Sequence, residues 1–337
     1  MTSAPVAALP ERASAFRRKL LGWFAKEGRE LPWRETRDPY AILVSELMLQ
    51  QTTVAAVIPY FERWMARFPE VATLAGASEN DVLHAWQGLG YYARARNLHA
   101  AAKQISRDGW REDFAQLPGV GRYTANAIST FAFDRAVPLV EANIARLLAR
   151  LTNYEQRIDD AAGAEHLWRT ATELLPKRHA RIYNSALMDL GATVCVSGIP
   201  RCDVCPVRAF CAALEPASLP RKAPRTALRR LRENHAYVRR HGSILLEQSH
   251  DRWRGMWILP RLPSVRAAQS PIYTGQFPFT HHRVTLAVFE GLAAPALPPN
   301  QRWFATGELD ALPLPSPHRR AVETLLATRL RSENREK

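Results

Sequence analysis

The sequence predicts a mainly α-helical protein with a smaller α+β region at its C-terminal end. Over residues 13–212, apolar residues recur at helical spacing, and short breaks rich in proline or glycine divide the pattern into separate helices. After residue 219 the pattern changes to short β-rich segments followed by one last helix over residues 317–330. At 337 residues the chain is long enough for two domains, each with its own core.

The composition indicates a polyanionic partner. The chain carries 46 Lys and Arg against 32 Asp and Glu, which gives a net charge of +14, and no long run of like charge accounts for the excess. Charge alone is equally compatible with a basic protein that binds no polyanion. No stretch of 18 apolar residues occurs, and the apolar stretch near the N-terminus is too short for a secretion signal, so we expect a cytoplasmic protein without a membrane partner.

Residues 117–146 predict a phosphate clamp followed by an acid. Gly119 and Gly121 lie between two helical patterns, so the tight turn exposes backbone N–H groups at the start of a helix over residues 122–133. Glu141 follows at the start of another helix. This spacing is typical of a helix-hairpin-helix with an acid behind it, although a GxG sequence also occurs in ordinary helix connections.

Glu46 is a candidate general acid. It lies within a helix expected over residues 40–52, which Asp38 and Pro39 are suited to begin. Its neighbours at helical spacing are largely apolar. A carboxyl group in an apolar cleft keeps its proton to higher pH, as a general acid near neutrality must, whereas most helical glutamates are simply solvated.

Four cysteines predict one metal site. They fall within seventeen residues at the spacing C-x6-C-x2-C-x5-C, which is poor material for a disulfide framework in a reducing compartment. Their chemistry suits a tetrahedral zinc ion or an iron–sulfur cluster and leaves the two open. The residues are Cys195, Cys202, Cys205 and Cys211.

Six motifs cover most of residues 29–211: LPWRETRDPY, SELMLQQT, IPYFERWMARFP, GLGYYARARNLH, LPGVGRYTA and the cysteine run. Together they resemble, in the same order, those of MutY-type adenine DNA glycosylases, of the helix-hairpin-helix base-excision superfamily. The resemblance implies a monomeric, monofunctional enzyme that hydrolyses adenine from A·8-oxoguanine or A·G mispairs in double-stranded DNA. It also implies that the cysteines hold a 4Fe-4S cluster and that the protein is associated with the nucleoid.

The resemblance assigns roles to residues of the reaction site. Glu46 would protonate the adenine and Glu141 would stabilise the cationic sugar, while Tyr123 and Asn143 would hydrogen-bond within the site. Tyr123 occupies the position where lyase relatives carry lysine, so no Schiff base is expected there. The chain departs from the family in one place: it has Glu141-Ala142-Asn143 where MutY has Asp-Gly-Asn. The longer acid must fold back or approach the sugar differently.

The resemblance also assigns residues that contact DNA or the base. Gln51 and Tyr91 match residues that enter the base stack, although Tyr91 and the adjacent Tyr92 are also compatible with simple helix packing. The hairpin glycines would bind phosphate. Positions around the adenine pocket are matched by Arg29, Leu31, Trp33 and Asp189.

The C-terminal part resembles the Nudix-like domain of MutY, which recognises 8-oxoguanine. Phe279, Thr280 and His281 lie where that family has Phe-Ser-His, and the interval before them is shorter than expected. The sequence has no catalytic Nudix box, so nucleotide hydrolysis is not expected. We expect a helical domain over 1–218 with its hairpin at 108–134 and its cluster loop at 195–211, a basic linker over 219–233 and a C-terminal domain over 234–337.

Two other functions fit parts of this pattern. A thymine glycosylase acting on T·G mispairs would share the cysteines, the tyrosine and an acid-Ala-Asn sequence. The altered acid at position 141 also fits a non-catalytic iron–sulfur protein that binds DNA lesions. The QQT sequence and the C-terminal domain favour adenine.

Overall fold

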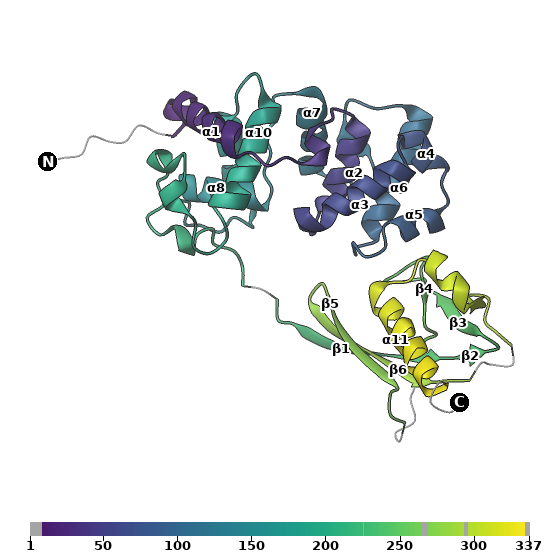
Figure 1. The fold of residues 1–337 in the computed structure, drawn as a ribbon. Helices are drawn as coiled ribbons and strands as arrows, with labels where there is room; N and C mark the ends of the chain where they lie inside the picture. The colour runs from purple at the N-terminus through teal and green to yellow at the C-terminus, as the bar shows by residue number, and fades with distance from the viewer. Residues whose placement is uncertain (1–8, 225, 264–268, 293–295, 334–337) are drawn as a thin grey trace. The chain divides into compact units, whose positions relative to one another are not determined.

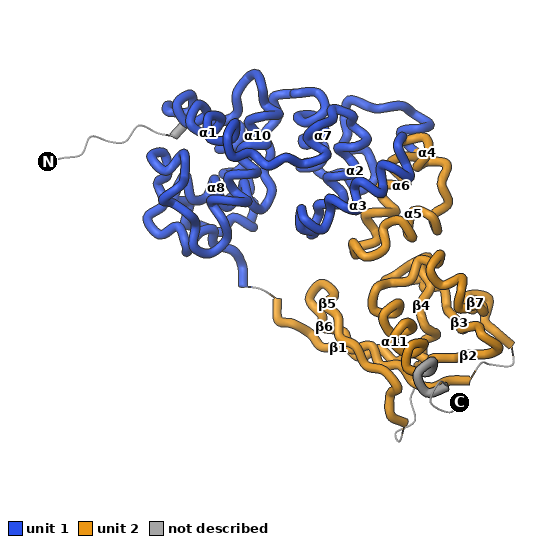
Figure 2. The backbone as a smooth tube through the Cα atoms, in the orientation of Figure 1, with its two compact units in different colours: residues 1–70, 104–224 blue, residues 71–103, 225–337 orange. Residues whose placement is uncertain are grey.

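The computed structural model describes residues 9–224, 226–263, 269–292 and 296–333, which form two compact units (Figures 1 and 2). The first unit comprises residues 1–70 and 104–224, and the second comprises 71–103 and 225–337. The chain passes between the units three times, after residues 70, 103 and 224, and the last of these passages lies within the predicted linker. Residues 71–103, which the sequence analysis placed in the helical domain, group with the C-terminal part.

The regular elements among the described residues of the first unit are helices, and an isolated β-bridge joins Arg157 to Arg221. A five-residue π-helical turn, Leu190–Val194, continues α10 towards the first cysteine. The α-helices are α1 (Ala13–Glu27), α2 (Pro39–Leu49), α3 (Val54–Arg67), the end of α6 (Ala93–Asp108), α7 (Arg122–Phe133), α8 (Ala142–Leu151), α9 (Ala161–Leu174) and α10 (Ala180–Asp189).

Helix α2 is central to this unit because it is buried on all sides. The Asp38 carboxylate caps it by accepting hydrogen bonds from the backbone N–H groups of Tyr40 and Ala41, and Pro39 occupies its first position. All residues from Tyr40 to Met48 are buried, and the helix packs against α7. The helix ends at Leu49, earlier than predicted, because Gln51 takes a left-handed backbone conformation with φ 58°.

Helices α1, α7, α8, α9 and α10 contribute to one continuous core. Helix α8 has a buried face that includes Ile144 and Leu148, and α1 packs against α10. Helix α7 spans the residues that the sequence predicted, 122–133. The apolar side chains buried between these helices include Phe16, Leu20, Leu147, Leu167, Tyr183 and Leu187.

The second unit combines short helices with two sheets. In the first sheet, β6 pairs in parallel with β1 and antiparallel with β5, and in the second, β3 pairs with β2, β4 and β7. The elements are α4 (Val71–Gly76), α5 (Glu79–Ala85), the start of α6, β1 (Arg229–Tyr237), β2 (Arg239–Arg240), β3 (Ser243–Gln248), β4 (Trp257–Ile258), β5 (Tyr273–Phe279), β6 (His282–Glu290), β7 (Gln301–Ala305) and α11 (Ser316–Glu333).

Strand β1 begins at Arg229, inside the segment that the sequence analysis assigned to the linker. Its first residues pair with β6 from His282 onwards, and their charged side chains remain exposed. The charged residues suggested a linker, but the backbone of this segment forms hydrogen bonds with β6, which is distant in the sequence and could not be inferred from the charges. The predicted combination of a mainly α fold with a smaller α+β region is confirmed.

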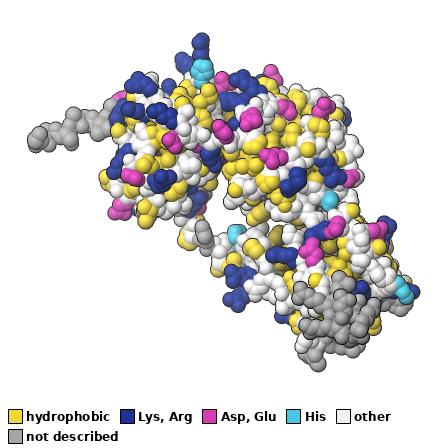
Figure 3. All heavy atoms as spheres, in the orientation of Figure 1, with side chains coloured by type: hydrophobic (Ala, Val, Ile, Leu, Met, Phe, Trp, Pro, Cys, Tyr) yellow, Lys and Arg dark blue, Asp and Glu magenta, His cyan; other side chains and the backbone are white. Residues whose placement is uncertain are grey.

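On the face shown in Figure 3, Lys and Arg side chains are interspersed with Asp and Glu rather than gathered into one patch. No helix in the described part of the chain combines the length and apolar character needed to cross a bilayer.

A close contact at Gly191 gives a test of this packing. A Cβ atom at Gly191 would lie 2.9 Å from both the backbone oxygen and the Cβ of Asn143, so Gly191→Ala should lower the free energy of unfolding by roughly 1–3 kcal/mol. At the exposed Gly22 of α1 a Cβ would meet nothing within 4 Å, so Gly22→Ala should instead be neutral or stabilising by up to about 1 kcal/mol. Thermal unfolding midpoints compare the two variants, and equal shifts would contradict the contact.

Candidate active site

A cavity of about 360 Å³ in the first unit collects most of the residues that the sequence predicted for the reaction and the base pocket. Its walls come from residues 29–34, α2, α7, α8 and α10. Apolar side chains such as Ile42, Leu49 and Phe131 form much of the surface. The predicted residues that line it are Arg29, Leu31, Trp33, Glu46, Gln51, Tyr123, Glu141 and Asn143.

Glu46 points into this cavity from α2 and is only 4 % exposed. Burial is the main cause that raises its pKa, to about 7, and the charge of Glu141 adds to the rise. A hydrogen bond from the Tyr123 hydroxyl and the charge of Arg34 oppose it. The balance keeps a proton on Glu46 up to about neutral pH, as a general acid requires.

Glu141 lies at the same cavity and also caps α8. Its carboxylate oxygens accept hydrogen bonds from the backbone N–H groups of Asn143 and Ile144, each at 2.8 Å, so the longer acid folds back onto its own helix. Burial raises the pKa of Glu141 above its ordinary value, and these backbone hydrogen bonds and the charge of Arg146 offset only part of that rise. Since N–H donors stabilise a carboxylate, these contacts favour the negative charge on Glu141 rather than on Glu46.

Tyr123 and Asn143 complete the polar part of the cavity. Burial raises the pKa of Tyr123 well above its ordinary value, and the charges of Glu46 and Glu141 add to the effect, so the hydroxyl stays a donor. The Asn143 side-chain oxygen accepts a 2.8 Å hydrogen bond from Arg146, which also donates to the Gly191 carbonyl at 2.6 Å. Glu46, Tyr123 and Glu141 are thus brought together as one interacting group.

Asp189 lies behind the cavity rather than on its wall. It is fully buried and accepts five hydrogen bonds from Arg29 and Arg34, between 2.6 and 2.9 Å. Burial alone would raise its pKa, but the hydrogen bonds from Arg34 and Arg29 outweigh burial and lower it. Asp189 therefore positions two guanidinium groups that do line the cavity.

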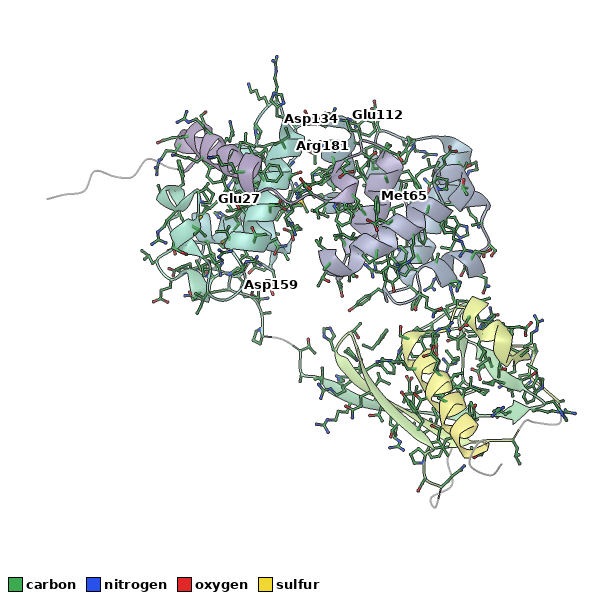
Figure 4. All side chains as sticks on the ribbon, viewed as in Figure 1. Glu27, Met65, Glu112, Asp134, Asp159 and Arg181 are labelled. Atoms are coloured by element: carbon green, nitrogen blue, oxygen red, sulfur yellow. The ribbon has the colours of Figure 1, made fainter. Side chains whose placement is uncertain are left out.

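Arg34 and Arg181 both line the cavity, although the sequence did not place either of them at the reaction site. The Arg181 guanidinium donates to the carbonyls of Phe131, Arg34 and Thr36, and its backbone N–H donates to Asp134 at 2.8 Å (Figure 4). Arg181 thereby ties the segment at Arg34 to the end of α7. Arg34 belongs to the motif LPWRETRDPY and directly follows Trp33, which was predicted to line the pocket. That position in the sequence was the available signal for Arg34.

Gln51 and Tyr91 share an unusual backbone conformation. Gln51 has φ 58° and Tyr91 has φ 49°, in the left-handed region that non-glycine residues rarely adopt. Both side chains are exposed, 46 % in the case of Tyr91, while Tyr92 is buried and only Tyr91 is presented to solvent. Such strain persists where the surrounding structure enforces it and is typical of functional positions.

The hairpin before α7 is open towards solvent. Gly119 has φ 76°, and Gly121 is the N-terminal cap of α7, with no side chain satisfying the first N–H groups. A Cβ at Gly121 would meet nothing within 4 Å. Arg122 follows, with its guanidinium carbon 3.7 Å from the centre of the Trp168 ring. The geometry suits a phosphate approaching the helix N-terminus.

The four cysteines line a second cavity of the first unit, of about 140 Å³. Burial raises the pKa of Cys205 to about 11, and the neighbouring cysteines add to the rise, so the Cys205 thiol resists ionisation. Within the described ranges no three His, Cys, Asp or Glu side chains converge on one ion. The sulfurs surround a space, and four sulfur donors fit an iron–sulfur cluster or a zinc ion.

In the second unit, Thr280 and His281 form the turn between β5 and β6. Phe279 pairs with His282 across this turn, and Thr280 has φ 49°, a strained value for a β-branched residue. Thr280 and His281 are exposed, and Arg252 lies 4.3 Å from the centre of the Phe279 ring. The predicted lesion-reading residues thus occupy an exposed hairpin tip.

Residues 44–173 match the family described as "HhH-GPD superfamily base excision DNA repair protein". The chain is 42 % identical over 215 residues to the "Adenine DNA glycosylase" of Rattus norvegicus, a match that covers 59 % of this chain and 42 % of the rat protein. The protein of that name from Mycobacterium tuberculosis is 44 % identical over 199 residues, which cover 56 % of this chain and 64 % of that protein.

Solved structures have the same fold as the HhH-GPD part. A thermostable thymine-DNA glycosylase superposes with a TM-score of 0.56 at 27 % identity, covering 61 % of this chain and 97 % of that chain. An endonuclease III–DNA covalent intermediate gives a TM-score of 0.52 at 22 % identity, over 60 % and 95 % of the two chains, and shows the fold alone. The chain spans less than half the length of its rat relative. The predicted resemblance to MutY-type glycosylases is confirmed.

The raised pKa of Glu46 predicts a pH-dependent stability. Since the folded state holds this proton more tightly than the unfolded chain, the stabilising contribution is complete below pH 4.5 and is lost as pH rises through about 7. The loss amounts to roughly 3 kcal/mol at most. Glu46→Gln removes this contribution, so its thermal unfolding midpoint should fall less than that of the wild type between pH 5 and pH 8. Parallel pH curves would contradict the raised pKa.

Proposed function

We propose that the protein is a monofunctional adenine DNA glycosylase that acts on A·8-oxoguanine or A·G mispairs in double-stranded DNA. The observation that carries the proposal is the pair of carboxyl groups in one cavity, with the proton on Glu46 and the charge on Glu141. The names of the relatives and the HhH-GPD domain support it. The proposal includes a monomer that binds nucleoid DNA in the cytoplasm.

The reaction needs the base to leave the duplex, which costs a few kcal/mol and least at a mispair. A cavity of about 360 Å³ is within the range of small-molecule sites. Glu46 transfers its proton to the adenine as the N-glycosidic bond breaks, and the Glu141 carboxylate stabilises the oxocarbenium-like sugar. Water then adds to the sugar carbon and gives a proton to the Glu46 carboxylate, which restores the acid.

The cavity favours hydrolysis over strand cleavage. A lyase forms a Schiff base between an amine and the sugar, and no lysine is among the described side chains that line this cavity. The side chain that approaches Glu46 from α7 is a phenol, Tyr123, whose pKa is raised. A protonated phenol orients Glu46 and cannot form the imine.

The cysteine cavity supports a 4Fe-4S cluster as the second part of the proposal. The four thiols would hold the cluster, which supplies a rigid covalent link between Cys195 and the loop that ends at Cys211. Equal amounts of iron and acid-labile sulfide in the purified protein would agree with this assignment. One zinc ion per chain, without iron, would refute it.

Thymine excision at T·G mispairs is the second candidate, because a thymine-DNA glycosylase superposes at a TM-score of 0.56. Single-turnover assays on A·8-oxoguanine, A·G and T·G duplexes distinguish the candidates. Adenine release alone supports the proposal, and thymine release alone replaces it. Binding without release of any base would indicate a non-catalytic lesion-binding protein.

Glu141 provides a sharp test of the two-carboxyl mechanism. Glu141→Asp retains a good helix cap but withdraws the charge from the cavity, so we expect a loss of roughly 10²-fold in the single-turnover rate. Glu141→Gln removes the charge and should lose about 10³-fold. Glu46→Gln should bind DNA and excise nothing at a measurable rate. If Glu141→Gln matches the wild type, the acid serves α8 only as a cap.

Arg122 is expected to contact a phosphate beside the hairpin. Arg122→Ala should weaken binding to matched and mismatched duplexes alike and reduce the slope of log K against log salt by about 1. Trp168→Leu keeps the charge of Arg122 but removes the aromatic ring on which its guanidinium rests. Affinity for DNA should therefore fall, while the slope of log K against log salt stays nearly constant. An unchanged slope in Arg122→Ala would mean that Arg122 only packs on Trp168.

The hairpin tip of the second unit should affect the choice of the opposite base. His281→Ala and Phe279→Ala should reduce the ratio of excision rates on A·8-oxoguanine and A·G duplexes, because His281 is exposed at the tip and the partly exposed Phe279 lies directly beside it. Thr280→Ser, which restores the family's residue, should keep the ratio. Equal losses on both duplexes in His281→Ala would assign the tip to general DNA binding.

A further inference from the structure

Arg150 is the most deeply buried arginine of the described chain and lies beside the cysteine cavity. Its side chain is in the core of the first unit, and the residue is 1 % exposed. The guanidinium donates to four carbonyls, those of Cys195 (3.3 Å), Val196 (2.7 Å), Gly198 (2.9 Å) and Leu219 (3.1 Å). Its remaining contact is a 3.3 Å hydrogen bond to the sulfur of Cys195.

This buried cation differs from the other buried arginine pairs of the unit. Arg29 and Arg34 share the carboxylate of Asp189, whereas Arg146 lies close enough to both Cys195 and Glu141 for negative charge on either to attract it. Within the residues that the structure describes, no carboxylate forms an ion pair with Arg150. Carbonyl groups satisfy its hydrogen bonds but carry no net charge. Burying a cation without a countercharge is costly.

The cysteine cavity is the place where a countercharge can form. Arg150 lines it together with all four cysteines, and the Cys211 thiol donates to the Arg150 carbonyl at 3.4 Å. Four neutral thiols would leave the guanidinium unbalanced. Four thiolates around a 4Fe-4S core carry a net negative charge, because four negative ligands exceed the charge of the core.

We propose that Arg150 is the buried countercharge of the anionic group that the four cysteines hold, an inference that rests on the proposed cofactor. It is a positioning residue that contacts the group through Cys195. Its carbonyl contacts also hold the backbone of residues 195–198 and 219, so charge balance must be separated from support of the loop. Arg150→Lys keeps the charge but loses the planar fork, whereas Arg150→Gln loses both.

The test uses the full-length, metal-loaded protein. A buried cation stabilises the more negative, reduced cluster, so Arg150→Gln should lower the one-electron midpoint potential, and Arg150→Lys should keep it close to that of the wild type. Arg150→Gln should also lose iron to a chelator roughly tenfold faster, as expected for the loss of one hydrogen bond to a charged group. Arg17→Gln is the matched control, because Arg17 donates to the carbonyls of Glu173, Leu174 and Leu175.

Stability measurements separate the two readings. If Arg150 only supports the loop, both variants lower the thermal midpoint and neither moves the potential, which overturns the inference. If Arg150→Gln does not fold, Arg150→Lys decides the matter: a retained potential with a lower thermal midpoint supports charge balance, and a lowered potential refutes it. A wild-type protein that contains no metal would refute the cofactor proposal itself. A metal-loaded wild type whose midpoint potential equals that of both Arg150 variants would refute only the role of Arg150.

Discussion

Two carboxyl groups that face one buried cavity constrain the rest of this structure. Burial raises the pKa of both carboxyl groups, and a negative charge on one disfavours ionisation of the other. The two groups differ in their hydrogen-bond donors. The first N–H groups of α8 donate to Glu141, whereas the donor that approaches Glu46 is the Tyr123 hydroxyl. Glu46 sits instead on α2, a helix surrounded by apolar side chains. The unequal environments divide the roles of acid and carboxylate between them.

The sequence predicted those features that depend on local pattern. Helix α7 has its expected bounds, and the positions of Glu46 and Tyr123 follow from helical spacing once the helices are known. Features that depend on distant residues were not predictable. The pairing of Asp189 with Arg29 joins positions 160 residues apart, so the sequence could place Asp189 near the pocket but not behind it. The first residues of β1 likewise depend on β6, more than fifty residues further along the chain.

Predicting the course of the Glu141 side chain required knowing the start of α8. The resemblance to MutY showed only that a longer acid replaces aspartate. Whether the side chain folds back or extends is settled by the donors within its reach, the N–H groups of Asn143 and Ile144. The left-handed backbone conformation of Gln51 and Thr280 could not be predicted from the sequence either, since neither residue type favours it. Tertiary packing imposes it.

The cap at Glu141 couples a local backbone signal to the protonation of the carboxyl pair. The hydrogen bonds that Asn143 and Ile144 donate are strongest when Glu141 carries its charge. Any event that moves the proton from Glu46 to Glu141 must therefore weaken the first turn of α8. Amide hydrogen exchange and the amide proton chemical shifts of these two residues would then record the ionisation state directly, without substrate. The amide groups in the first turn of α8 therefore report which of the two carboxyl groups carries the proton.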